Sequence, residues 1–111
     1  MTYAIPVTPD GGVEQRWGRA PRIAVATVEG GAISDWQEHA VGWDVAHDEG
    51  TEGSHHARVV RFLRENAVTH VVVDHMGAGM HRTLGTMGIE ILPVRSPVAR
   101  EAVQLAAALL P

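Results

Sequence analysis

The stretch THVVVDHMGAGM, residues 69–80, decides how this chain folds. Its three consecutive valines, residues 71–73, form an unbroken β-branched run, which is typical of a strand that is covered on both faces. Residues 74–79 follow as a glycine-rich turn, and Gly88 is placed to end the next helix in the left-handed conformation. That helix is predicted from apolar residues at helical spacing, which are Met80, Leu84 and Met87.

The rest of the chain adds four strands and two helices to this unit. Residues 29–32 predict the turn of a hairpin, and residues 42–54 predict an exposed loop that ends in Ser54 as a helix N-cap. Ser96 and Pro97 predict the N-cap and first residue of the last helix. The predicted strands are residues 3–7, 22–28, 33–41 and 89–94; the first helix is residues 55–66, and the last buries Ala99, Ala102, Val103, Ala106 and Leu110.

The predicted element order is βββαβαβα, which is that of a ribonuclease-H-like mixed sheet with strand order 3-2-1-4-5 and three helices. The length of 111 residues is in the range of one domain, and we expect a single unit over residues 1–111. Parallel strands need a crossover connection, and here each crossover carries a helix. The chain is therefore predicted to be an α/β domain built on one five-stranded sheet.

The composition of the chain argues against several classes of function. The formal charge is -4, and the nine basic residues are arginines scattered along the chain, which argues against nucleic-acid binding. The chain has no cysteine, so it supplies neither a disulfide nor a thiolate ligand. The longest apolar run, residues 106–110, is far shorter than the roughly 20 residues of a membrane span, and the N-terminus lacks signal-peptide features. We expect a cytoplasmic protein without a membrane partner.

Four short motifs resemble those of one known family. Residues 16–21 read Arg-Trp-Gly-Arg-Ala-Pro and resemble the His-Phe-Gly-Arg-Ala-Pro stretch of NifX/NifB-type domains, which act in iron-molybdenum cofactor biosynthesis. Residues 52–56, Glu-Gly-Ser-His-His, and residues 76–80, Met-Gly-Ala-Gly-Met, are similar to family motifs at similar spacing. Leu84 and the Gly-Ile pair at residues 88–89 continue the likeness, which covers nearly the whole chain.

The resemblance implies a ribonuclease-H-like fold that binds an iron-molybdenum cofactor or its iron-sulfur precursors. It also implies cluster-assembly proteins as partners, and a homodimer stays open. One departure concerns the first motif, in which Arg16 and Trp17 replace the usual histidine and phenylalanine. A metal ligand cannot be carried over to Arg16, but a cationic contact to an anionic cofactor can.

The glycine-rich turn is the predicted cofactor cradle. Gly77 and Gly79 lie between a strand and a helix, where free N–H groups and the helix dipole favour an anion. Arg82 stands where a dinucleotide-binding motif requires its third glycine, and the chain has no lysine for a P-loop. The competing interpretation is a tight turn that allows close helix packing. Arg16, Gly77 and Gly79 are thus the predicted cofactor-binding residues.

The chain contains seven histidines, a high count for its length, and imidazole binds transition metals without a thiolate. His75 and His81 flank the glycine-rich turn, and His55 opens the first helix, so these three are the predicted metal ligands. Ordinary solvated or capping roles are the alternative for each. Met80 belongs to an apolar helical stripe and is predicted to pack in the core, whereas Met76 stays open. The three tryptophans are predicted to be structural.

Catalysis is not predicted. Two-metal nuclease chemistry needs converging carboxylates, and Asp74 has no obvious mate in the sequence. Cysteine is absent, and the serines at positions 34, 54 and 96 do not lie in a nucleophile elbow. The sequence favours a non-catalytic carrier for an iron-molybdenum or iron-sulfur cluster. The alternative is a small protein-interaction or regulatory domain that lost cofactor binding when Arg16 replaced the histidine.

Overall fold

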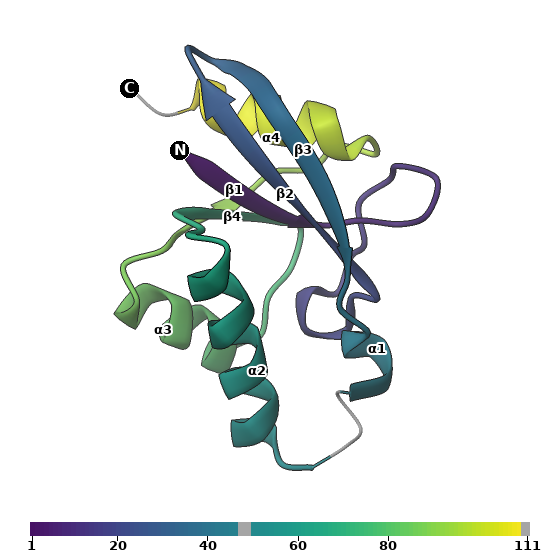
Figure 1. The fold of residues 1–111 in the computed structure, drawn as a ribbon, viewed down its shortest axis with the longest axis vertical. Helices are drawn as coiled ribbons and strands as arrows, with labels where there is room; N and C mark the ends of the chain where they lie inside the picture. Colours follow the sequence, from purple (N-terminus) through teal and green to yellow (C-terminus); the bar gives the residue numbers. More distant parts are fainter. Residues whose placement is uncertain (47–49, 110–111) are drawn as a thin grey trace.

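Five strands form one mixed sheet in the order β3-β2-β1-β4-β5 in the computed structural model, which describes residues 1–46 and 50–109 (Figure 1). β1 pairs antiparallel with β2 and parallel with β4, while β4 pairs parallel with β5 and β2 antiparallel with β3. The predicted fold class and strand order are therefore confirmed. The strands are β1 (Thr2–Pro6), β2 (Arg22–Glu29), β3 (Ala32–Ala40), β4 (His70–Val73) and β5 (Glu90–Pro93).

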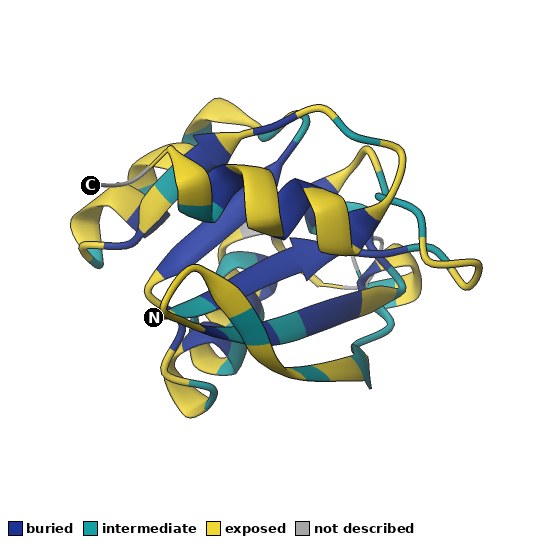
Figure 2. Cartoon of the chain, turned by 90° about the horizontal axis from the view of Figure 1, so that it is seen from above, coloured by how far each residue is buried: buried dark blue, intermediate teal, exposed yellow. Residues whose placement is uncertain are grey.

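The helices cover both faces of this sheet. α2 (Glu52–Glu65) and α3 (Ala78–Thr86) share one hydrophobic core with one face, and α4 (Ala99–Ala108) shares a second core with the opposite face (Figure 1). Figure 2 shows the inner strands largely buried and the outer faces of the helices exposed, whereas the edge strand β3 has no buried residue. No helix in the described part of the chain is long and apolar enough to cross a membrane.

β4 is the central parallel strand that its sequence predicts. Val71, Val72 and Val73 are all buried, with Val72 packed in the α4 core and the other two in the α2 and α3 core. Burial on both faces explains why the strand shows no alternation of polar and apolar residues. Gly88 has a φ of +77° after α3, the left-handed conformation expected of a residue that ends a helix.

A buried polar cluster closes the opposite, amino-terminal edge of the parallel strands. The His70 imidazole stacks on the Tyr3 ring with centroids 4.7 Å apart, and its Nε2 lies 3.5 Å from a Glu90 carboxylate oxygen. Burial, and secondly the charge of Glu90, raises the pKa of the Tyr3 hydroxyl above its usual value. His70 and Tyr3 are buried at this edge, whereas the Glu90 side chain is 56% exposed.

The predicted exposed loop at residues 42–54 is corrected in two places. It contains a one-turn helix, α1 (Trp43–Ala46), whose Trp43 side chain is 1% exposed; residues 47–49 of the prediction lie outside the described residues. Helix α2 starts at Glu52 rather than after Ser54, because Thr51 and Ser54 cap each other reciprocally. The part of the chain that the structure describes contains four α-helices, where three were predicted.

The start of α4 also differs from the prediction. Its N-cap is Val98 rather than Ser96, so Pro97 precedes the helix instead of occupying its first position. The Ser96 hydroxyl oxygen instead accepts a hydrogen bond from the Val98 amide at 3.4 Å. The predicted buried face of α4 is confirmed for Ala99, Ala102, Val103 and Ala106, and Leu110 lies outside the described residues.

An aromatic cluster explains the burial of Trp43. Its indole packs edge-to-face against Trp17, in the 3-10 helix η1 (Trp17–Arg19), and against Phe62 on α2, with centroids 5.3 and 5.6 Å apart. Edge-to-face pairs of this kind add to the free energy gained from burial itself. Trp43 therefore joins two segments that lie far apart in sequence.

We predict that Trp43→Ala lowers the free energy of unfolding by about 3 to 5 kcal/mol, because it opens a large cavity in the core. Val45→Ala, in the same short helix, is the control: Val45 is 64% exposed, and its truncation should change stability by less than about 0.5 kcal/mol. Urea denaturation followed by circular dichroism measures both. Equal effects of the two substitutions would contradict the structural role of Trp43.

Candidate functional site

A pocket of about 290 Å³ opens between residues 16–19 and the turn that joins β4 to α3. It lies beyond the carboxyl-terminal edge of β4, where open α/β sheets bind their ligands. Residues 55 and 56, at the start of α2, form its third wall. The predicted residues that line it are Arg16, His55, His75, Gly77 and Gly79. Five of the six predicted site residues therefore meet in one place.

His81 is the predicted ligand that lies elsewhere. It lines an adjoining open depression on the outer side of the same turn, together with Arg82. His75 lines both hollows, so it connects them. Helical geometry explains the separation, because His81 directly follows Met80, which lines the first pocket, and consecutive residues of an α-helix point about 100° apart.

A hydrogen bond from His55 holds residues 16–19 in place. The imidazole is 3% exposed, and its Nε2 lies 2.8 Å from the Gly18 carbonyl oxygen. Because a carbonyl only accepts hydrogen bonds, Nε2 must carry the proton. Nδ1 then accepts from the Arg58 guanidinium at 3.2 Å. Both ring nitrogens of His55 are engaged, so in this arrangement the residue holds the pocket together and offers no lone pair to a metal.

A backbone contact with the turn after β4 also holds this segment in place. Arg16 and His75 form an isolated parallel β-bridge, which extends the sheet pattern beyond the end of β4. Trp17, the next residue, is 2% exposed and packs against Trp43. Its indole N–H is buried and has no hydrogen-bond partner among residues 1–46 and 50–109. The backbone of this segment is thus held against the turn that carries the predicted cradle.

The turn itself presents the start of α3 to the pocket. Gly77 is the N-cap, and no side chain caps the helix there. The first N–H groups of an α-helix have no partner within the helix, and its dipole is positive at this end. Gly77 has a φ of -64°, and a Cβ built on it would meet no atom within 4 Å. Neither backbone conformation nor packing therefore requires a glycine at this position.

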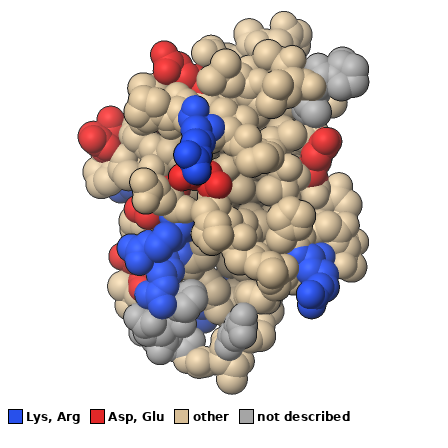
Figure 3. Space-filling view, turned by 180° about the vertical axis from the view of Figure 1, so that it is seen from behind, with Lys and Arg blue, Asp and Glu red and all other residues tan. Residues whose placement is uncertain are grey.

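The charges around the pocket are modest. The Arg16 side chain is 69% exposed, and its Nε lies 3.9 Å from a Glu14 carboxylate oxygen, which makes a weak surface pair. Arg19 is a second arginine in the lining. Over the described residues, no three His, Cys, Asp or Glu side chains converge as a metal-ligand set. Arginine and acidic side chains are interspersed on the face in Figure 3, with no continuous basic stripe.

Several other residues of the lining were not predicted as site residues, among them Trp17, Arg19 and His56. Arg19 and Trp17 belong to the Arg-Trp-Gly-Arg-Ala-Pro motif, so that motif was the available signal, and His56 lies beside the predicted His55. Met80 is buried in the core as predicted, at 5% exposure, and Met76 is partly buried beside it. Both methionines also border the pocket, which gives its wall an apolar portion.

Comparisons with known proteins agree with this architecture. The apo form of the orange protein from Desulfovibrio gigas has a TM-score of 0.75 at 18% identity, covering 99% of this chain and 90% of that one. A protein from Thermotoga, provisionally assigned as a NifB protein of the DUF35 family, has a TM-score of 0.67 at 22% identity, covering 96% and 87%. A protein from Methanocaldococcus jannaschii, provisionally assigned as a dinitrogenase, has a TM-score of 0.71 at 11% identity, covering 97% and 88%.

These similarities at low identity show a shared fold. No curated protein matches the chain. The family model described as dinitrogenase iron-molybdenum cofactor matches residues 1–109, almost the full length. That family suggests a role in the biosynthesis or binding of the dinitrogenase cofactor. By this match, the chain belongs to the dinitrogenase iron-molybdenum cofactor family.

Proposed function

We propose that this protein is a non-catalytic binding or carrier module for an anionic metal cluster, either an iron-molybdenum cofactor or an iron-sulfur cluster. The observation that supports this most is the meeting of Arg16, His75 and Gly77 around one pocket, although they come from two distant segments. Family membership supports the same class of ligand. The cluster is the cargo of the protein in this proposal and not a part of its fold.

Anion binding would use two kinds of donor in the pocket. The uncapped start of α3 supplies backbone N–H groups, and Arg16 and Arg19 supply positive charge. Hydrogen bonds between charged partners are roughly twice as strong as those between neutral partners. The open space beside Gly77 lets a bulky anion approach the backbone closely.

His75 is the proposed metal ligand within the pocket. Its side chain is exposed at the mouth, and neutral imidazole binds iron and other transition metals without a thiolate. His81 is proposed as an outer ligand across the adjoining depression. Two histidines leave coordination positions for a partner, and a cluster-assembly protein or a second copy of this chain in a homodimer would fill them.

A non-catalytic role is supported by the structural use of the candidate reactive groups. The Asp74 carboxylate pairs with Arg95 at 3.0 Å, and the Ser54 hydroxyl group takes part in the cap of α2. The Ser96 hydroxyl donates to the Val98 carbonyl at 3.3 Å. None of these contacts resembles a nucleophile that is activated by an adjacent base.

The direct test is anaerobic titration of the purified protein with isolated iron-molybdenum cofactor and, separately, with a reconstituted iron-sulfur cluster. Absorbance and native mass spectrometry measure binding and stoichiometry. We predict that the wild-type protein binds one of the two clusters. The double variant His75→Ala, His81→Ala should bind it about tenfold or more weakly, because two imidazole ligands are lost.

Stability separates loss of ligands from loss of folding in that test. His75 and His81 are both exposed, so the double variant should keep its free energy of unfolding within about 0.5 kcal/mol of wild type. If neither cluster binds the wild-type protein, the carrier proposal is wrong and the protein-interaction alternative takes its place. Binding that is unchanged in the double variant would remove the two histidines from the site.

A glycine substitution tests the cradle separately. We predict that Gly77→Ala weakens cluster binding by about tenfold, because the new methyl group obstructs approach to the N–H groups of α3. Its folding should be unaffected, since the added Cβ meets no atom within 4 Å. Titration with the same cluster and urea denaturation measure the two quantities.

Gly85→Ala is the matched control for the cradle. Gly85 lies in the same helix, and a Cβ there also meets no atom within 4 Å, but the residue does not line the pocket. We expect unchanged cluster affinity and a gain in stability of about 0.5 to 1 kcal/mol from the better helix propensity of alanine. Cluster binding at wild-type strength in Gly77→Ala would show that the cluster does not approach the start of α3.

A further inference from the structure

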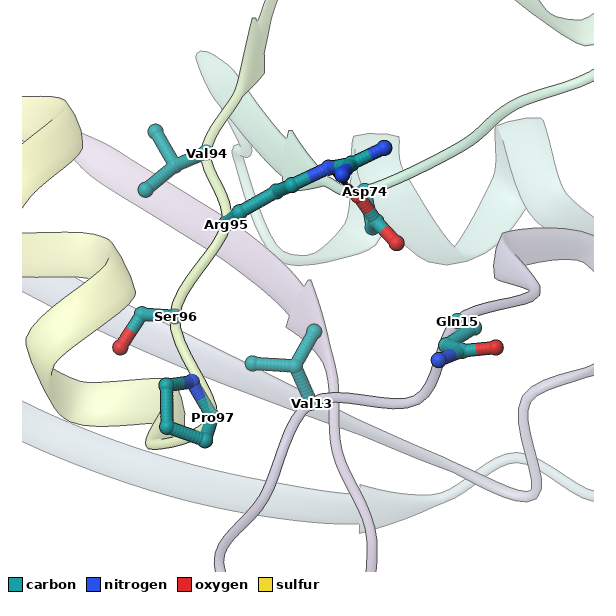
Figure 4. A pocket seen from close by; sticks show the side chains of 7 residues that line it. All are labelled: Val13, Gln15, Asp74, Val94, Arg95, Ser96 and Pro97. Carbon is teal, nitrogen blue, oxygen red and sulfur yellow. Dashed lines mark hydrogen bonds and ion pairs between the residues drawn. The ribbon is translucent and has the colours of Figure 1, made fainter.

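A second crevice, of about 560 Å³, opens beyond the carboxyl ends of β4 and β5 (Figure 4). Asp74 follows β4 on one side, and Val94 and Arg95 follow β5 on the other. Val13 reaches it from the segment after β1. None of the predicted site residues lines this crevice. It is therefore separate from the pocket lined by Arg16, His75 and Gly77, which we call the cluster pocket after its proposed ligand.

The topology of the sheet creates this crevice. β4 and β5 are parallel neighbours, but α3 leaves β4 toward one face of the sheet and α4 leaves β5 toward the opposite face. The two connections therefore diverge just beyond the strand ends. A crevice at such a switch point is the usual place for a ligand in open α/β sheets.

The β-bridge between Arg16 and His75 divides the two sites. Gln15 and Asp74 line the second crevice, whereas Arg16 and His75, their immediate neighbours in sequence, line the cluster pocket. The two bridged backbone segments thus have the cluster pocket on one side and the second crevice on the other. A ligand in the second crevice leaves the cluster pocket accessible.

An ion pair spans the second crevice. The Arg95 Nε donates to the Asp74 Oδ1 at 3.0 Å, and Figure 4 shows the arginine reaching across to the carboxylate. This contact uses one of five guanidinium donors and one of two carboxylate oxygens. The side chains are 90% and 29% exposed, so water or a ligand can reach both. A positive and a negative group therefore stand side by side at the mouth.

The remaining wall of the crevice combines apolar and polar residues. Val13 and Pro97 contribute hydrocarbon surface, and Figure 4 shows them on the side of the crevice away from Asp74, whereas Gln15 and Ser96 contribute polar atoms. Val94 also borders the crevice, but it is 8% exposed and belongs to the α4 core. Apolar walls with a few polar groups that fix orientation are typical of small-molecule sites. The lining is suited to a ligand with a polar end and an apolar end.

We propose that this crevice binds a zwitterionic small molecule, an α-amino acid with an apolar side chain. The ligand carboxylate would meet the outer N–H donors of Arg95, whose planar fork matches a carboxylate. The ligand ammonium would meet the second oxygen of Asp74, and the side chain would pack on Val13 and Pro97. Each charge of the ligand then finds its opposite, and the pair at the mouth stays neutral overall.

Other ligand classes fit the same groups less well. An inorganic anion would pair with Arg95 but would lie next to the negative charge of Asp74, and a metal cation would face the reverse conflict. Neither would cover the apolar part of the wall. A simple carboxylic acid would use Arg95 and the wall but would leave Asp74 without a new partner.

The test uses three probes that share one hydrocarbon chain: L-leucine, 4-methylpentanoate, which lacks the ammonium, and 3-methylbutylamine, which lacks the carboxylate. Each is titrated at neutral pH into ¹⁵N-labelled protein, with inorganic phosphate as a fourth probe. We expect L-leucine to shift the amide signals of Val13, Asp74 and Arg95 and to leave that of Gly79 in place. Its affinity should exceed that of each analogue by about fivefold or more.

Variants assign the two charges. Arg95→Gln and Asp74→Asn should each lower the affinity for L-leucine by about fivefold or more, since each removes one charged contact. Arg61→Gln is the control, because Arg61 is exposed on α2 and lines neither site. The dispersion of the amide spectrum shows whether each variant is folded.

Four outcomes would overturn the proposal. Equal affinity for L-leucine and 4-methylpentanoate would identify a general carboxylate site, and equal affinity for phosphate an inorganic-anion site. Absence of saturation by L-leucine up to tens of millimolar would remove the crevice as an amino-acid site. Signal shifts confined to the cluster pocket would place the ligand on the other side of the bridge. None of these outcomes depends on whether a metal cluster binds.

Discussion

The hydrogen bond between the buried imidazole of His55 and the Gly18 carbonyl holds residues 16–19 on the start of α2. Those residues form neither a strand nor a long helix, so their position depends on side-chain contacts that reach them from elsewhere. The neighbouring Trp17 adds an edge-to-face contact with Trp43. A buried polar group without a partner is costly, so losing the Gly18 contact would destabilise this arrangement. The cluster pocket exists because this segment is fixed against the body of the protein.

The same segment also explains why the carboxyl edge of the sheet carries two hollows. Once Arg16 is paired with His75, the backbone divides that edge into a pocket beside α3 and a crevice beside α4. The pocket has arginines, histidines and helix N–H groups, which suit an anionic cluster. The crevice has one charge of each sign and a partly apolar wall, which suit a neutral zwitterion. The bridge between Arg16 and His75 therefore separates two hollows that suit two different kinds of ligand.

Sequence reasoning predicted the sheet well because local patterns encode it, as residues 71–73 do by being uniformly β-branched. It missed helix α1, which carries Trp43, since one helical turn is too short to show a hydrophobic period. The pairing of Asp74 with Arg95 joins the ends of neighbouring strands, so it follows only once strand order is known. Gly77, Gly79, His55 and His75 were predicted from the glycine-rich turn and the positions of the histidines, and Arg16 from the resemblance of its motif. The engagement of both His55 nitrogens depends on contacts with Gly18 and Arg58 that no local pattern reveals.

Native-state hydrogen exchange of the Ala20 amide tests most directly whether the pocket is held in place by His55. This amide donates to the Trp17 carbonyl at 3.2 Å, within the anchored segment, and Ala20 is fully buried. We predict slow exchange in the wild-type protein, by about a thousandfold or more relative to a free peptide. His55→Ala should remove most of that protection while the amides of β1 and β2 stay protected. Fast exchange of Ala20 in the wild-type protein, or protection that is unchanged in His55→Ala, would contradict this account.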